Sequence, residues 1–323
     1  MSKDLFHLKP HHKDTLNCVD HVIYNASFLY SADISLWFLE RRGFYYGKKT
    51  VPGEDLYDMA RITSRKEYSY QLLKEYCGME HVEINDRTFS AKETLEYVID
   101  CAKEQRLVGL TFDSFYCPWS RSYHNIHVPH SVLIVGYEEM GFLILDGYLS
   151  SSIQLLPFLE LDNTNMYLSY HGKRTKRQIG KQTVLELLDK NIRQYGKYRD
   201  MQAFREEIRE YSTTNPKDKP CSVDLDTSLF LLYLSGLGWD NINFSYALQT
   251  LQAQGVIQRN IDAIALGLKR QWKNWLQIRG YAMKAVLLRE QFILMFEFMY
   301  QRMGDIIALE KELDEQIFEC IRD

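Results

Sequence analysis

HSVLIVGYEEMGFLILDG, residues 130–147, carries the strongest structural signal in this chain. Residues 131–137 and 142–145 are apolar and rich in β-branched side chains, which is typical of buried strands. The residues between them, Glu138-Glu139-Met140-Gly141, are polar and include a glycine, as a tight hairpin turn requires. The stretch therefore predicts two antiparallel strands that belong to the core of a sheet.

The two ends of this predicted hairpin carry the first candidate for chemistry. In an antiparallel pair the start of one strand lies beside the end of the next, so we expect His130 and Asp146 to be neighbours. A carboxylate that accepts a hydrogen bond from an imidazole fixes the tautomer of the ring and supports its charged form. A single histidine at a strand end is more often structural, so the pair alone does not identify a catalytic site.

A cysteine far upstream makes the pair more informative. Cys18 follows a mainly polar segment and precedes residues 19–29, which form an apolar helical run. A thiol at the N-terminus of a helix feels the positive end of the helix dipole, which lowers its pKa. The other thiol close to the pair in sequence, Cys117, precedes Pro118 in a loop and lacks this activation. Cys18 is therefore the stronger candidate for a reactive thiol.

The composition of the chain limits the classes of protein to which it can belong. The chain has 323 residues, a formal net charge of −4 and 46% hydrophobic residues, which is enough for two domains. No apolar run reaches the roughly 18 residues of a membrane span, and residues 1–6 lack the apolar core of a secretory signal. We therefore expect a cytoplasmic protein that contacts no membrane. The mildly acidic balance argues against nucleic acid as a partner.

Motifs for common bound groups are missing from the sequence. The six cysteines form no CxxC pair, which argues against a structural zinc site. No GxGxxG or GxxxxGK[ST] motif is present, so nothing predicts a bound dinucleotide or nucleoside triphosphate. The expectation is a protein with no metal and no bound cofactor.

The chain changes character at the basic segment 171–181, where we place the domain boundary. Residues 1–172 predict an α+β domain, in which a central helix at 19–41, broken near 31–33, packs on an antiparallel sheet. Further strands are expected at 81–85, 107–113 and 166–170, with helices at 90–105 and 157–161 and two short ones within 53–77. Residues 173–323 predict an all-helical domain, with helices at 183–195, 198–211, 224–237, 244–254, 257–276, 280–303 and 305–321 and an interruption at Gly238-Trp239-Asp240-Asn241.

Residues 16–161 resemble the butirosin biosynthesis protein H family, a papain-like group of acyltransferases found in natural-product pathways. Three blocks in the same order carry the resemblance: Asn17-Cys18 opening a helix, the strand and aromatic loop at 107–119, and the hairpin from His130 to Asp146. The resemblance implies a papain-like domain, and a helical C-terminal extension also fits the family. Two departures are a glycine at 147, where the family usually has proline, and a glycine-rich loop reduced to residues 43–47.

By this resemblance, Cys18 is the nucleophile, His130 the base and Asp146 the residue that orients the base. The family's activity implies transfer of an acyl group from an acyl or peptidyl carrier protein to an amine, and the phosphopantetheine thioester arrives on that partner. The basic segment 171–181 is a candidate docking patch for such a carrier. The sequence leaves open a hydrolase with the same triad (a thioesterase, amidase or peptidase), a cyclase that releases the thioester, and a non-catalytic binding protein.

Further site residues are predicted around this triad. Papain-like enzymes place a glutamine shortly before the nucleophile to donate to the oxyanion. His12 occupies that position here and Asn17 directly precedes the cysteine, so both are candidate oxyanion donors. The aromatic loop predicts three substrate-binding residues near the catalytic edge, namely Asp113, Tyr116 and Trp119.

Overall fold

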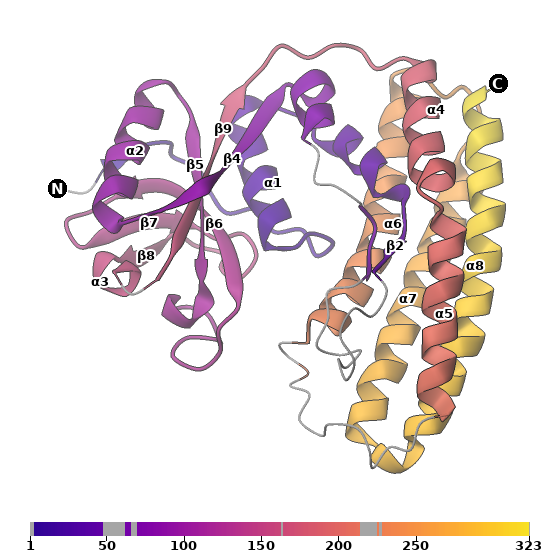
Figure 1. Cartoon of the computed structure of the whole chain (residues 1–323). Coiled ribbons are helices and arrows are strands. Elements are labelled where there is room, and N and C mark those ends of the chain that lie inside the picture. The colour runs from indigo at the N-terminus through magenta and orange to yellow at the C-terminus, as the bar shows by residue number, and fades with distance from the viewer. Residues whose placement is uncertain are drawn as a thin grey trace. The chain divides into compact units, whose positions relative to one another are not determined.

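A computed structural model describes residues 3–47, 62–65, 70–162, 164–213, 225 and 228–322, without the side chains of residues 85 and 86. The chain forms two compact units. One comprises Met1–Ile34 and Tyr70–Gln178, and the other comprises Ser35–Ser69 and Ile179–Asp323 (Figure 1). The expected division after residue 172 differs from this one, because Ser35–Ser69 belongs with the C-terminal helices.

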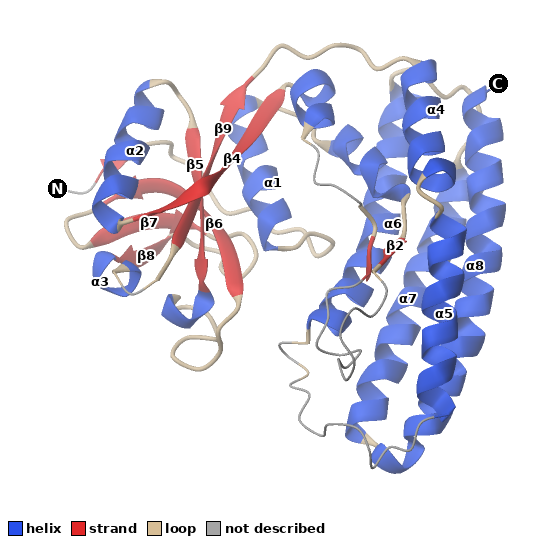
Figure 2. Ribbon diagram, viewed as in Figure 1, coloured by secondary structure: helices blue, strands red, loops and turns tan. Residues whose placement is uncertain are grey.

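The described residues of the first unit form a seven-stranded antiparallel sheet (Figure 2). The predicted strands are confirmed, and the hairpin pairs Leu133 with Leu145 and Tyr137 with Phe142. Two strands escaped prediction because one has only two residues and the other ends at a proline. In order across the sheet lie β4 (Met79–Phe89), β9 (Met166–Lys173), β5 (Leu107–Asp113), β6 (Pro129–Tyr137), β7 (Gly141–Leu145) and β8 (Gln154–Pro157), while β1 (Lys3–Asp4) pairs with β6.

Helix α1 (Cys18–Tyr30) packs on this sheet against β6, β9 and β4. The side chain of Asn17 caps its N-terminus, and its C-terminus ends at Ser31, which has a positive φ of 51°. The predicted break near residues 31–33 is therefore confirmed. Close approach depends on Gly109 of β5, because a Cβ there would lie 3.2 Å from Val22 Cγ1.

The remaining helices of the first unit are shorter. The predicted capping box is present at α2 (Ala91–Lys103), where Ser90 and Glu93 bond to each other's backbone N–H groups. Val98 and Cys101 of α2 join the apolar cluster that includes Val108 and Leu110 of β5. The unit also contains η3 (Leu73–Cys77), η4 (Ser114–Tyr116) and α3 (Phe158–Leu161).

The second unit is mainly helical. Its core is one apolar cluster in which Phe204, Phe230, Trp275 and Phe296 are almost fully buried. Phe44 joins the same cluster from the early part of the chain. The elements of this unit are η1 (Ser35–Arg42), β2 (Tyr45–Tyr46), β3 (Ile62–Thr63), α4 (Lys181–Asp189), η5 (Lys190–Gln194), α5 (Lys197–Thr213), α6 (Leu229–Ala253), α7 (Asp262–Leu287), η7 (Arg289–Gln291) and α8 (Phe292–Arg322).

The predicted interruptions of the long helices are wrong. Helix α6 continues through Gly238, α7 through Gly280 and α8 through Gly304. A glycine inside a helix costs only about 1 kcal/mol, and Gly238 allows close packing because a Cβ there would lie 3.0 Å from Trp272 Cδ1. The predicted start of α6 at residue 224, like most of the short helices expected within 53–77, lies outside the described residues.

A buried ion-pair network explains why the segment that begins at Ser35 belongs to the helical unit. The guanidinium of Arg42, 3% exposed, bonds to Asp314 at 2.7 Å and to Glu310 at 2.7 Å. Lys197 bonds to the same two carboxylates. Burial raises the pKa of Glu310, but Arg42 and Lys197 outweigh it and lower the pKa to about 2. Two cations and two anions therefore neutralise each other away from water.

None of the helices in the described part of the chain combines the length and the apolar character that a bilayer crossing requires.

Replacing Arg42 by alanine leaves Glu310 and Asp314 facing a single lysine. We expect Arg42→Ala to lower the free energy of unfolding of the helical unit by about 3–5 kcal/mol, because an uncompensated charge stays buried. Urea unfolding followed by tryptophan fluorescence measures this change, since four of the five tryptophans lie in that unit. The control is Arg199→Ala, which removes an exposed pair with Asp200 and should cost less than about 1 kcal/mol. Equal effects of both changes would contradict the network's role.

Candidate active site

The three predicted catalytic residues come together at the N-terminus of α1. Asp146 directly follows β7, His130 is the second residue of β6, and Cys18 is the first residue of α1. His130 Nε2 lies 2.7 Å from Asp146 Oδ2, which leaves Nδ1 of the ring for the hydrogen bond with Cys18. His130 and Asp146 are 5% and 2% exposed, while Cys18 is partly exposed. The thiol, the imidazole and the carboxylate therefore form one hydrogen-bonded line, in the order expected of a nucleophile, a base and an orienting acid.

The electrostatics of this line favour a charged pair. Burial lowers the pKa of His130, but its bonds to Asp146 and Cys18 outweigh burial and raise the pKa to about 10. Burial raises the pKa of Cys18, but the bond to His130, its charge and the N–H of Ser131 bring the pKa below its usual value. The N-terminal position of Cys18 on α1 also stabilises a thiolate. Both shifts favour a thiolate–imidazolium pair over a neutral thiol beside a neutral imidazole.

Asp146 is held in place by several donors. Trp119 Nε1 donates to Oδ2 at 2.7 Å, and the backbone N–H groups of Tyr148 and Leu149 donate to Oδ1 at 3.0 Å. Burial raises the pKa of Asp146, but the bonds to His130, Trp119 and Leu149 bring it below the usual value. The carboxylate therefore stays charged beside His130. Trp119, which the sequence predicts to bind substrate, donates to Asp146, and its substrate role stays a prediction.

Residues 5–17, which connect β1 to α1 and are called the N-terminal arm below, contact Gly147, the residue that follows Asp146. The ring of His12 donates from Nδ1 to the carbonyl of Gly147 at 2.7 Å, and its Nε2 lies 2.9 Å from Asp14. A Cβ at Gly147 would lie 2.5 Å from both Asn25 Nδ2 and the carbonyl oxygen of His11. A larger residue at 147 would displace the arm, which is the physical reason for glycine at this position.

The two predicted oxyanion donors both make structural contacts. Asn17 Oδ1 accepts from the N–H of Asp20 at 2.9 Å and so caps α1. That bond uses the oxygen of the amide, whereas an oxyanion needs its NH2 group. His12 would have to give up one of its two ring bonds before it could donate. The backbone N–H groups of Cys18 and Val19, at the start of α1, have no acceptor within the helix and are candidate oxyanion donors.

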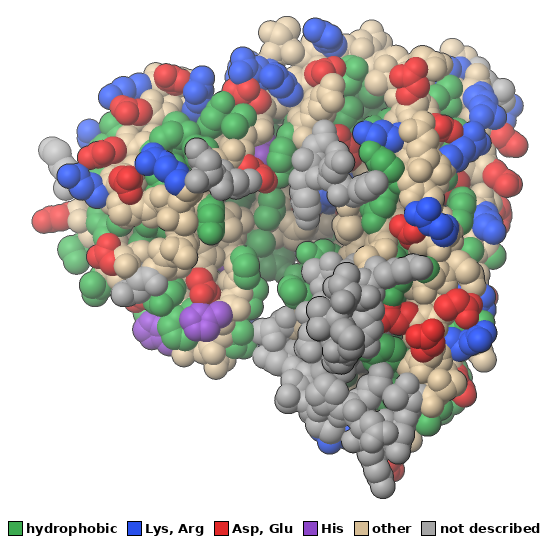
Figure 3. Space-filling view, viewed as in Figure 1, with side chains coloured by type: hydrophobic (Ala, Val, Ile, Leu, Met, Phe, Trp, Pro, Cys, Tyr) green, Lys and Arg blue, Asp and Glu red, His purple; other side chains and the backbone are tan. Residues whose placement is uncertain are grey.

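Two of the predicted substrate-binding residues lie on the loop around η4. Asp113 caps this short helix through the N–H of Phe115 at 3.0 Å, and its other oxygen lies 2.6 Å from His127 Nδ1. Tyr116 packs edge-on against Phe115. His127 is 65% exposed, and histidines are visible on the surface of this unit (Figure 3). Neither Asp113 nor Tyr116 lines the cavity beside Cys18, and their substrate role stays a prediction.

Cys117 lies close to the triad without being activated. Its side chain is fully buried, and burial together with the charge of Asp146 raises its pKa to about 12. Ligand atoms of Cys117, His130 and Asp146 lie within 4.8 Å of one another, a spacing that a metal ion could bridge. Metal binding needs a thiolate and would break the bond between His130 and Asp146. These residues therefore fit a hydrogen-bonded site better than a metal centre.

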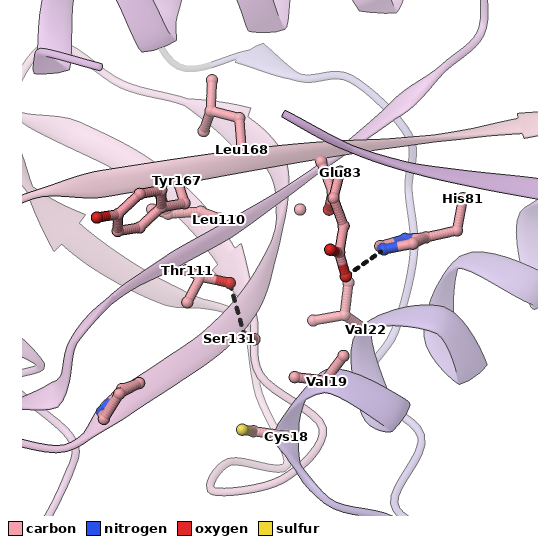
Figure 4. Close-up of a pocket in the computed structure, with 13 residues that line it drawn as sticks. Cys18, Val19, Val22, His81, Glu83, Leu110, Thr111, Ser131, Tyr167 and Leu168 are labelled. Carbon is pink, nitrogen blue, oxygen red and sulfur yellow. Dashed lines mark hydrogen bonds and ion pairs between the residues drawn. The ribbon is translucent and has the colours of Figure 1, made fainter. Parts of the chain in front are cut away.

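A cavity of about 430 Å³ opens beside Cys18 (Figure 4). Val19 and Val22 of α1 line it next to the thiol, and His81 and Glu83 of β4 line its other part. His81 and Glu83 are site residues that the sequence did not predict. The only signal was the alternation of residues 81–85, which puts both side chains on one face of a strand without showing that this strand lies near Cys18.

No protein-family model and no curated protein matches this chain. The assignment of the site therefore rests on its geometry. A thiolate at a helix N-terminus, a buried histidine that bridges to an anchored carboxylate, and a cavity that reaches the sulfur can together support attack on a carbonyl carbon.

The lowered pKa of Cys18 predicts alkylation by iodoacetamide at pH values below the range of an ordinary cysteine. His130→Ala removes the bond and the charge that lower this pKa, so the onset of alkylation should move to higher pH. Peptide mapping by mass spectrometry across a pH series measures the rate at each thiol. Cys117, which is buried and has a raised pKa, is the internal control and should stay unlabelled while the protein is folded. The same onset in the wild type and in His130→Ala would refute the ion pair.

Trp119→Phe keeps an aromatic ring but removes the N–H that bonds to Asp146. Without this donor Asp146 is held less firmly beside His130, so His130 is less well oriented toward Cys18, and we expect alkylation of Cys18 near neutral pH to slow severalfold. The matched control is Trp239→Phe in the helical unit, which should leave the profile unchanged. A variant that loses stability but keeps the wild-type pH profile would show that Trp119 is only a packing residue.

Proposed function

We propose that this protein is a thiol-dependent acyltransferase. Cys18 takes an acyl group from a carrier-protein thioester and passes it to an amine. The observation that carries the proposal is the buried line from Asp146 through His130 to Cys18, with a cavity of about 430 Å³ open at the sulfur. The arrangement of a cysteine-bearing helix on an antiparallel sheet that supplies the histidine and the aspartate also supports a papain-like fold for the first unit.

The geometry supports a two-step mechanism. In the first step the Cys18 thiolate attacks the thioester carbonyl, and N–H groups at the start of α1 hold the developing oxyanion. The intermediate collapses to acyl-Cys18, and the departing pantetheine sulfur takes the proton from the His130 imidazolium. In the second step an amine attacks acyl-Cys18, and the neutral His130 accepts the amine proton. Release of the amide returns the thiolate–imidazolium pair, with Asp146 charged throughout.

The carrier supplies the driving force in this scheme. Transfer of the acyl group from one thiol to another changes the free energy little. Formation of the amide then makes the overall reaction favourable. The chain itself needs no metal or diffusible cofactor for these steps. A cytoplasmic location belongs to the same proposal, because carrier-bound intermediates are made there.

The proposed docking region for the carrier is the basic segment around residues 173–178. All six of these residues are exposed, and Arg174 among them bonds to Glu80 at 2.7 Å. The remaining positive charges of the segment can attract an acidic partner and steer its approach. Mutation of such charges changes the association rate more than the chemistry.

Intact-protein mass spectrometry with simple acyl-pantetheine thioesters tests the proposal. Without an amine, the wild type should gain the mass of one acyl group, and Cys18→Ala should gain none. Cys117→Ser is the matched control and should be acylated like the wild type. Added primary amines should then remove the acyl group as an amide.

Other outcomes of this experiment would favour one of the alternative functions or the alternative nucleophile. Loss of the acyl group at the same rate with and without amines would mean a hydrolase. Release of a cyclic product from substrates with an internal amine would mean a cyclase. Acylation that persists in Cys18→Ala but disappears in Cys117→Ser would mean that Cys117 is the nucleophile.

A further inference from the structure

Tyr148 lies beside the triad and is held there through its backbone. Its N–H donates to Asp146 Oδ1 at 3.0 Å, and the carbonyl of the preceding residue, Gly147, accepts from the ring of His12 at 2.7 Å. These two bonds fix the turn that carries Tyr148. The contacts that hold the carboxylate of the triad therefore also position this tyrosine.

The ring of Tyr148 packs against two histidines that flank Cys18. Its centroid lies 5.5 Å from that of His21 and 6.3 Å from that of His130. His130 forms a hydrogen bond with the thiol of Cys18, and His21 lies three residues after Cys18 on α1, a spacing that makes the two side chains neighbours on the helix surface. Tyr148 therefore lies against the end of α1 that carries the thiol.

Cys18 lies between two flanks of α1. Successive residues of an α-helix are rotated by about 100° around its axis. Val19 and Val22 therefore lie on one side of Cys18, where they line the cavity (Figure 4), and His21 lies on the other side, where it contacts Tyr148. An acyl chain in the cavity would place its carbonyl carbon at the sulfur, and the carbonyl oxygen, which points away from the chain, would face Tyr148.

The hydroxyl of Tyr148 is suited to donate to that oxygen. Among the residues that the structure describes, none forms a hydrogen bond with it, and the side chain is only partly buried. Burial raises the pKa of Tyr148, and the charges of Cys18 and Asp146 raise it further. The phenol therefore keeps its proton at neutral pH and can act as a donor.

Most other polar side chains near the sulfur are already engaged. His21 donates from Nδ1 to the carbonyl of Asn17 at 2.9 Å and accepts at Nε2 from the N–H of Lys13 at 3.1 Å. Both ring nitrogens of His12 are bonded as well. The NH2 group of Asn17 is the remaining alternative to the hydroxyl of Tyr148.

We propose that Tyr148 is a catalytic residue whose hydroxyl, together with the backbone N–H of Cys18, donates to the oxyanion of the tetrahedral intermediate. This inference rests on the proposed acyl transfer and adds a residue to its site. In each step the carbonyl oxygen gains negative charge as the nucleophile attacks, and the phenol donates a hydrogen bond without losing its proton. Collapse of the intermediate restores the C=O bond and leaves Tyr148 unchanged.

Tyr148→Phe tests the inference, because it removes the hydroxyl and keeps the ring. Acylation of Cys18 by an octanoyl thioester of N-acetylcysteamine and aminolysis of the acyl-enzyme by a primary amine both form an oxyanion on the same carbonyl group. Rapid quenching followed by intact-protein mass spectrometry measures the two rates. We expect both to fall roughly a hundredfold to a thousandfold, the loss typical of one oxyanion donor.

Alkylation of Cys18 by iodoacetamide separates catalysis from a merely structural role. This reaction displaces iodide from a saturated carbon and forms no oxyanion, so Tyr148→Phe should keep the wild-type alkylation rate and pH profile. Tyr137→Phe is the matched control, because it removes a hydroxyl at the other end of β6, about 20 Å along the strand from Ser131, and should react like the wild type. Asn17→Ser keeps an oxygen that can cap α1 but removes the NH2 group, and should slow acylation less than Tyr148→Phe does.

Wild-type acylation in Tyr148→Phe would overturn the inference and leave acyl transfer intact. Slowing of only one of the two steps would overturn it as well, because the hydroxyl would then contact the leaving thiol or the amine. An equal loss of alkylation would show that Tyr148 only positions the thiol, and a larger loss in Asn17→Ser would assign the oxyanion to Asn17. A wild type that no thioester acylates would overturn the proposed function and this inference with it.

Discussion

The bond between His130 and Asp146 is the interaction on which the rest of the first unit depends. Both groups are almost fully buried and lie 2.7 Å apart. A buried charge is tolerated only when it is paired and hydrogen-bonded. Asp146 meets this condition because three further groups donate to its carboxylate. Trp119 reaches it from the loop after β5, while Tyr148 and Leu149 reach it from the turn after β7. The same pairing orients the imidazole toward Cys18, so the polar network that stabilises this part of the core also sets up its chemistry.

Two glycines allow the surrounding elements to close on this network. Gly109 lets α1 approach the sheet through Val22, and Gly147 lets the N-terminal arm pass over the turn that holds Asp146. A side chain at either position would clash with these neighbours and force α1 or the arm to shift. Gly109 also lies in the floor of the cavity.

In the helical unit, too, the buried charges are paired and hydrogen-bonded, but by different residues. Arg42 and Lys197 are buried with Glu310 and Asp314, and no member of this set could remain buried alone. This network joins a segment near residue 40 to helices α5 and α8 near the end of the chain. A division of the chain by composition alone misses the connection, because Ser35–Ser69 is continuous in sequence with the helix that carries Cys18.

Local sequence was sufficient for much of the fold and for the pairing of His130 with Asp146, whereas Cys18 was assigned to the same site through the family resemblance. The alternating and continuous apolar runs predicted the central strands, the Ser90 capping box predicted α2, and an antiparallel hairpin necessarily places His130 beside Asp146. Helix ends in the second unit were mispredicted because glycine costs little inside a helix that packs closely, as at Gly238. The positions of Trp119, His81 and Glu83 were decided only by tertiary structure. Pairing of β4 with β9 brings Glu83 to the cavity beside Cys18, and no local pattern encodes which strands become neighbours across so many residues. The sequence by itself determined which residues could react, and the order of strands in the sheet determined what lies around them.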